Sequence, residues 1–105
     1  GAAKAVKELE KEQKSRSTRM VRDSIDGALL DIATFYRDVM MVQSGNAGAL
    51  INTDMADAIH AYAAKHPAHT TITKITAIME ARTNLAHNAA PLLTCEALMC
   101  QLAKA

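Results

Sequence analysis

Histidines, cysteines and carboxylates are the side chains of this sequence that could hold a metal ion or perform acid–base chemistry. Asp57 and His60 are three residues apart and would share one face of a helix, with His66 nearby. A two-metal site in a helical bundle needs Glu-x-x-His pairs on two helices, and the sequence contains none. Cys95 and Cys100 would lie about 140° apart around a helix, which favours core positions over metal ligation or a disulfide. We therefore expect no metal site.

Motifs for nucleotide binding and covalent catalysis are also missing. The four glycines form neither a GxxxxGK[ST] phosphate loop nor a GxGxxG turn. No serine lies in a Gly-x-Ser-x-Gly elbow, and Glu80 and Glu96 are isolated carboxylates rather than an acid–base pair. The sequence predicts a domain that is not an enzyme and that needs no cofactor.

The sharpest concentration of charge is the basic segment from Lys14 to Arg22. The first 22 residues hold seven basic and three acidic side chains, although the whole chain has a net charge of only +1. This segment could contact a phosphate backbone, or it could be a solvated face on which Arg19 and Arg22 pair with the aspartates four residues further on. No aromatic residue is interleaved, so base stacking is not supported. The candidate basic surface consists of Lys14, Arg16, Arg19 and Arg22.

The pattern of apolar residues predicts an all-α protein. Residues 2–14 are strong helix formers with few apolar positions, which is typical of an exposed leading helix, and Ser15–Thr18 should weaken it. Apolar residues then recur at spacings of four and three, which predicts a long helix ending near Gln43. Three shorter helices should follow: one ending near Lys65, one starting at Thr70 or Thr71, and one with Pro91 in its first turn. We expect a bundle of about five helices, divided into a leading connector (residues 1–17) and a helical domain (residues 18–105).

The long helix is apolar over more than one face. One seam of this helix should belong to the core. Truncation of a core residue to Ala should cost about 2–5 kcal/mol of stability. The core residues that we predict are Ile25, Ile32, Phe35, Ile75 and Leu98. The strip beside that seam is either more core or an interface to another subunit, where Tyr, Met and Arg are enriched. The candidate subunit interface is Leu29, Tyr36, Arg37, Met40 and Met41.

Several stretches together suggest a family. They are the charged segment 7–19, the run Phe35-Tyr36-Arg37-Asp38-Val39, and the segments 50–54, 75–88 and 96–99. These stretches resemble the C-terminal region of the delta-prime subunit of bacterial DNA polymerase III, in the form found in actinobacteria. The Phe-Tyr-Arg-Asp run is the most specific part of the resemblance, which covers essentially the whole chain.

The resemblance implies a place in the clamp loader, a five-subunit ATPase that opens the sliding clamp and closes it around primed DNA. Loader subunits have C-terminal helical domains that pack side by side into a collar. A collar-type bundle would have the C-terminal domains of neighbouring clamp-loader subunits as partners. The ATPase core, zinc module and arginine finger of this family lie upstream, so Arg16 is not assigned as the finger.

Two functions therefore remain in view. The first is an oligomerisation domain of the delta-prime subunit, without catalysis, membrane contact or small-molecule substrate; on this interpretation direct DNA contact is not expected. The alternative is a small helical nucleic-acid-binding domain that uses the basic segment from Lys14 to Arg22. The longest uncharged stretch, residues 39–53, is too short to span a bilayer, and we expect a cytoplasmic location.

Overall fold

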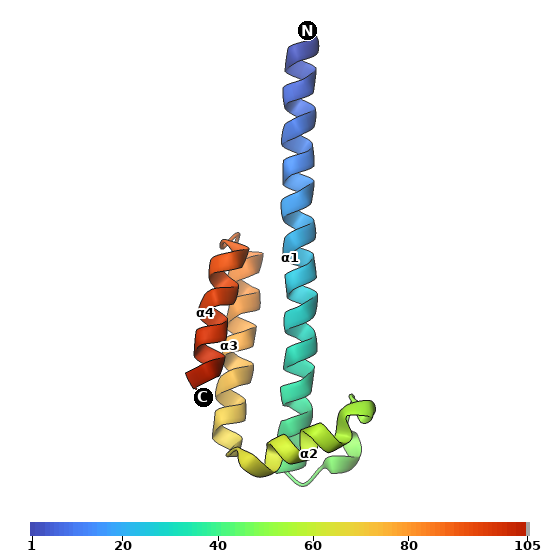
Figure 1. The fold of residues 1–105 in the computed structure, drawn as a ribbon, viewed down its shortest axis with the longest axis vertical. Helices are drawn as coiled ribbons and strands as arrows, with labels where there is room; N and C mark the ends of the chain where they lie inside the picture. Colours follow the sequence, from blue (N-terminus) through green and yellow to red (C-terminus); the bar gives the residue numbers. More distant parts are fainter. Residues whose placement is uncertain (105) are drawn as a thin grey trace.

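The chain folds into four α-helices and two short 3₁₀ helices in the computed structural model, which describes residues 1–104 (Figure 1). No strand occurs among these residues, which confirms the all-α class. Four helices are found rather than about five, because the leading segment and the long helix are one. The elements are α1 (Ala2–Gln43), η1 (Ala47–Ala49), η2 (Thr53–Met55), α2 (Ala56–Lys65), α3 (Ala68–Ala86) and α4 (Pro91–Lys104).

Helix α1 runs without a break through the Ser15–Thr18 segment that was expected to weaken it. The hydroxyl of Thr18 donates a 3.0 Å hydrogen bond to the Lys14 carbonyl oxygen one turn earlier, so it adds to the helical pattern instead of competing with it. With 42 residues, α1 is about 63 Å long, close to the 66 Å length of the molecule. Residues 1–21 are all exposed and extend beyond the turn between α3 and α4 (Figure 1).

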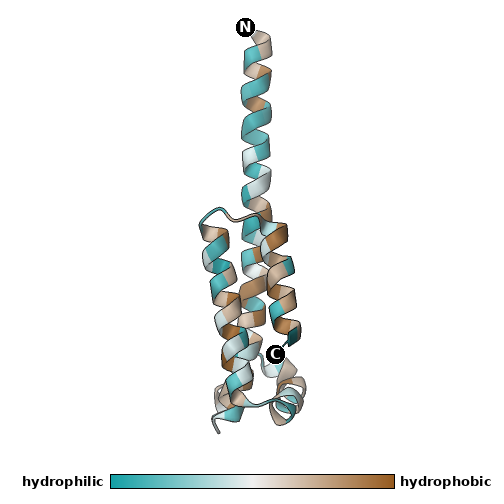
Figure 2. Ribbon diagram, turned by 90° about the vertical axis from the view of Figure 1, so that its left-hand side faces the viewer, coloured by the Kyte–Doolittle hydropathy of each residue, from teal (hydrophilic) through white to brown (hydrophobic). Residues whose placement is uncertain are grey.

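The lower half of α1 forms a thin bundle with the other helices. Helix α3 runs antiparallel to α1, α4 lies along α3, and α2 crosses at the end of the bundle (Figure 1). The quarter-turn view of Figure 2 places α3 and α4 in front of the lower part of α1, with the hydrophilic upper part of α1 standing alone. Helix α4 packs mainly on α3 and only slightly on α1, so it forms an edge of the bundle.

The core lies where α1, α3 and α4 meet. Alanine is unusually frequent there, and its small side chain lets α1 and α3 approach closely while larger residues fill the flanks. Ile25, Ile32, Tyr36 and Leu102 pack against this core from its edge and are half-buried. The buried cluster is Leu29, Ala33, Ala77, Ile78, Ala81, Leu85 and Leu98.

The predicted core is confirmed at Leu98, which is 2% exposed. Ile25, Ile32, Phe35 and Ile75 are only half-buried. The reason is the thinness of the bundle: α3 packs mainly on α1 and α4, and α4 rests mainly on α3, so only the central strip of each apolar face is covered. The predicted seam of α1 falls beside that strip.

The helix ends follow local chemistry at most positions. Helix α1 ends at Gln43, α2 at Lys65 and α4 begins at Pro91, as predicted. Helix α3 starts at Ala68 instead of Thr70 or Thr71, directly after Pro67, whose φ of −70° suits the entry into a helix. Helix α3 ends at Ala86, and the chain then turns at Asn88, whose φ of 66° lies in the left-handed region that asparagine tolerates.

The close contact of α1 with α3 should make the stability of the domain sensitive to side-chain volume at Ala33. Replacing Ala33 by Leu adds volume to a side chain that is 4% exposed at the centre of the core, so we expect a loss of about 1–3 kcal/mol in the free energy of unfolding. The matched control is Ala28→Leu, an exposed position on the same helix, where the change should stay within about 0.5 kcal/mol. Urea unfolding followed by circular dichroism measures both. Equal losses would contradict the assignment of the core.

Candidate functional site

The residues predicted for a subunit interface mostly serve the chain itself. Leu29 is 5% exposed inside the core, where another chain cannot reach it, which corrects its assignment to the surface. Tyr36 packs against the core and is half-buried; burial, together with the neighbouring Tyr62, raises its pKa to about 12. Met40 and Met41 are half-buried near the end of α1.

Asp38 fixes the loop that follows α1. Its side chain is completely buried and accepts hydrogen bonds from the backbone N–H groups of Ile51, at 3.0 Å, and Asn52, at 2.7 Å, and from the Asn52 side-chain amide at 2.8 Å. Arg37 adds a 3.0 Å ion pair to Asp38 and a 2.8 Å bond to the carbonyl oxygen of Ala49. Burial alone would raise the pKa of Asp38, but these donors together hold it below its ordinary value.

A cluster of aromatic rings surrounds a buried lysine where α1, α2 and α3 meet. Phe35, Tyr36 and Tyr62 contact one another edge to face, with ring centroids 5.5–5.9 Å apart. Lys74 of α3 is 6% exposed; its ammonium donates to the Tyr62 hydroxyl and lies 5.1 Å and 5.5 Å from the centres of the Tyr62 and Tyr36 rings. The rings thus take the place of a counter-ion for this lysine. His66 closes the cluster by stacking on Tyr62 at 3.9 Å.

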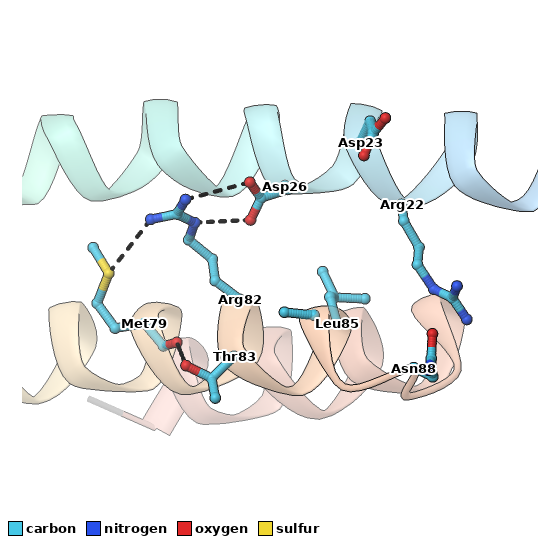
Figure 3. Close-up of a pocket in the computed structure, with 9 residues that line it drawn as sticks. Arg22, Asp23, Asp26, Met79, Arg82, Thr83, Leu85 and Asn88 are labelled. Atoms are coloured by element: carbon cyan, nitrogen blue, oxygen red, sulfur yellow. Dashed lines mark hydrogen bonds and ion pairs between the residues drawn. The ribbon is translucent and has the colours of Figure 1, made fainter.

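An ion pair joins α1 to α3 on the other side of the contact (Figure 3). Arg82 donates from Nε to one oxygen of Asp26 at 2.8 Å and from Nη2 to the other at 3.3 Å. These hydrogen bonds, with the attraction between the charges, lower the pKa of Asp26. The pair lines an open hollow of about 590 Å³. Because Asp26 bonds to Arg82, it does not pair with Arg22, whose side chain runs instead toward Asn88 (Figure 3).

The four residues of the candidate basic surface do not share a face. Successive residues of a helix are rotated by about 100°, so Lys14 and Arg16 point in nearly opposite directions. Arg19 is likewise exposed, whereas Arg22 is the first residue of α1 that the bundle covers in part. The expected weakening of the helix at Ser15–Thr18 concealed this geometry, because residues can be assigned to common faces only along one continuous helix.

The outer face of α4 was not predicted as a site. We use this name for Leu92, Leu93 and Met99, which are 72%, 67% and 62% exposed. Leu92 and Met99 have the spacing of one apolar helix face, but α4 rests mainly on one helix and only Leu98 is fully covered. A signal was present in the sequence: α4 carries apolar residues on more sides than one supporting helix can bury.

Residues 1–104 contain no group of three or more His, Cys, Asp or Glu side chains arranged to hold a metal ion. Within the same range, no helix is both long enough and apolar enough to cross a membrane. Cys95 is half-buried, Cys100 is exposed, and both are free thiols.

Residues 20–103 match the protein family described as DNA polymerase III, delta subunit, C terminal. The matched range contains α2, α3, nearly all of α4 and the part of α1 that packs in the bundle. Comparison with curated proteins and with solved structures gives no significant match.

The effect of replacing the buried carboxylate of Asp38 on stability should depend on pH. In Asp38→Asn, one oxygen that accepts backbone N–H groups becomes an amide donor, so we expect a loss of about 1–3 kcal/mol in unfolding free energy at pH 7. Because folding lowers the pKa of Asp38, its ionised form stabilises the native state above the ordinary value of about 3.9, and this contribution disappears as the pH falls through the lowered pKa.

The difference in stability between wild type and Asp38→Asn should therefore be largest at pH 7 and shrink toward pH 2.5, as measured by urea unfolding at both values. Asp31→Asn, which alters an exposed aspartate on the same helix, is the matched control and should change stability by less than about 0.5 kcal/mol at pH 7. A difference that stays constant between the two pH values would show that the charge of Asp38 is not what holds the loop.

Proposed function

Since the chain belongs to the family formed by the C-terminal domain of the DNA polymerase III delta subunit, we propose that it is the collar domain of a delta-prime type subunit. In this role it binds the C-terminal helical domains of neighbouring clamp-loader subunits and so supports ATP-driven loading of the sliding clamp onto DNA. The domain itself acts by binding and has no catalytic step. The resemblance of the Phe35–Val39 run and the flanking segments to delta-prime supports this finer assignment.

The observation that carries the proposal is the outer face of α4. Leu92, Leu93 and Met99 expose most of their surface on an edge helix of the bundle, and Leu92 and Met99, seven residues apart, lie on the same side of it. Exposed apolar surface of this kind marks interaction sites on folded proteins. A standard interface covers about 800 Å² on each partner, to which one face of a 14-residue helix can contribute a part. Docking a helix of a neighbouring domain here would extend the row of α1, α3 and α4 sideways.

The charged residues of the bundle support an architectural role for the domain. Asp26 bonds to Arg82, Asp38 bonds to its loop, and Lys74 is enclosed by tyrosine rings. Each of these groups has a partner that fixes the fold. A binding domain needs this rigidity, because a pre-organised surface loses less conformational entropy on association.

Co-elution tests the proposal. The chain is mixed in turn with each of the purified clamp-loader subunits and with the ATPase subunits together, and the mixtures are analysed by size-exclusion chromatography with light scattering. We expect a stable complex with a defined stoichiometry. If the chain elutes as a separate species from all of these mixtures, the oligomerisation function is wrong.

A pair of double variants locates the interface. Leu92→Gln/Met99→Gln removes two exposed apolar side chains from the outer face of α4, and we expect at least a tenfold increase in the Kd of the complex with unchanged helicity. The matched control is Val6→Gln/Leu9→Gln, which changes two similarly exposed apolar residues on the projecting part of α1. If the complex forms but the two variants bind equally well, the interface lies elsewhere on the domain.

A further inference from the structure

A row of cations lies along one face of the projecting half of α1 and ends at Arg22, the first residue of the helix that the bundle covers in part. The cationic row consists of Lys4, Lys7, Lys11, Lys14 and Arg22, with Thr18 filling the remaining position. The spacings of three and four residues keep these side chains on one side of a helix, and α1 is continuous over the whole range. From Lys4 to Arg22 the row spans about 27 Å.

The row continues the buried face of the same helix. After Arg22 the series of three- and four-residue steps runs through Ile25, Leu29 and Ile32, which pack in or against the core. The row therefore points to the side on which the bundle lies, but beyond the end of α3 that side is open (Figure 1). One face of α1 thus has an apolar, occupied half and a cationic, unoccupied half.

None of the five cations forms an ion pair within residues 1–104. The two ion pairs in this range are Arg37–Asp38 and Arg82–Asp26, which lie in the bundle. Glu8, Glu10 and Glu12 flank the row without interrupting its spacing. A stripe of unpaired positive charge at regular intervals attracts a polyanion and releases the counter-ions of that polyanion on binding.

The composition of the row favours a nucleic-acid backbone over an acidic protein. Protein interfaces have an apolar centre, and this row has none, since Val6 and Leu9 lie on other sides of the helix. Single-strand binding relies on aromatic side chains that stack with bases, and the first aromatic residue of the chain is Phe35. Phosphates of a duplex require only cations, and an α-helix fits along the major groove of DNA.

We propose that the cationic row of α1 binds the phosphate backbone of duplex DNA without sequence preference. This site differs from the Lys14–Arg22 segment considered from the sequence, because Arg16 and Arg19 lie outside it. It is independent of the collar proposal, since the row and the outer face of α4 are on different helices. Over 27 Å, each strand of a duplex presents about eight phosphates, more than enough for five cations.

Fluorescence anisotropy with a labelled 20-base-pair duplex tests the proposal, with the full 105-residue chain at 50 and 200 mM KCl. We expect micromolar binding at the lower salt concentration and a log–log salt slope of about −4. In Lys7→Gln/Lys11→Gln the Kd should rise roughly tenfold and the slope should shrink by about 2. The matched control, Arg16→Gln/Arg19→Gln, removes the same charge outside the row and should raise the Kd less than about threefold.

Glutamine is a good helix former, so both double variants should keep the circular dichroism signal of the wild type. No binding at 50 mM KCl, or equal losses in the two variants, would overturn the proposal. Tighter binding of poly-glutamate than of the duplex would identify an acidic polypeptide as the occupant and would also overturn it. Equal or tighter binding of a 20-nucleotide single strand would reject the duplex as the preferred ligand.

Discussion

The close contact between α1 and α3 is the interaction on which the rest of the structure depends. Ala33 on one helix and Ala77 and Ala81 on the other bring the two backbones together, so that larger side chains interlock beside them. Beside this contact, Arg82 reaches both oxygens of Asp26. Helix α4 is held chiefly by α3, so the position of its outer face also follows from this contact.

The run from Phe35 to Asp38 shows how a sequence feature that is specific to a family can be architectural. Phe35 and Tyr36 build the aromatic enclosure of Lys74, while Arg37 and Asp38 hold the chain where it leaves α1. All four residues lie near the end of α1, where the chain reverses direction before α2. Tyr36 and Arg37, which were candidates for the interface, thus also hold the fold of the domain, and the more exposed apolar residues of α4 are the stronger candidate.

The sequence predicted the helical class and most helix ends, because Pro67, Pro91 and the apolar periodicity act locally. It did not predict which part of each apolar face is buried, since that depends on how many neighbours each helix has. Met99 illustrates this: its spacing fits a core position, but it is 62% exposed because no helix covers that side of α4. The cationic row was missed for a different reason, namely that Ser15–Thr18 was expected to weaken the helix, whereas Thr18 bonds to its own helix.

The length of α1 allows its two halves to carry different chemistry on one face. An isolated helix as polar as residues 2–21 would be marginally stable, because it buries nothing and nucleation is unfavourable. In this protein the segment continues the part of α1 that is packed against α3, so no new helix nucleus is needed. Its Ala, Lys and Glu residues favour extension of the helix. The projecting half therefore needs no apolar support, and all of its surface remains available for charge. The bundle therefore fixes the direction of the projecting half of α1, although residues 1–21 are not covered by it.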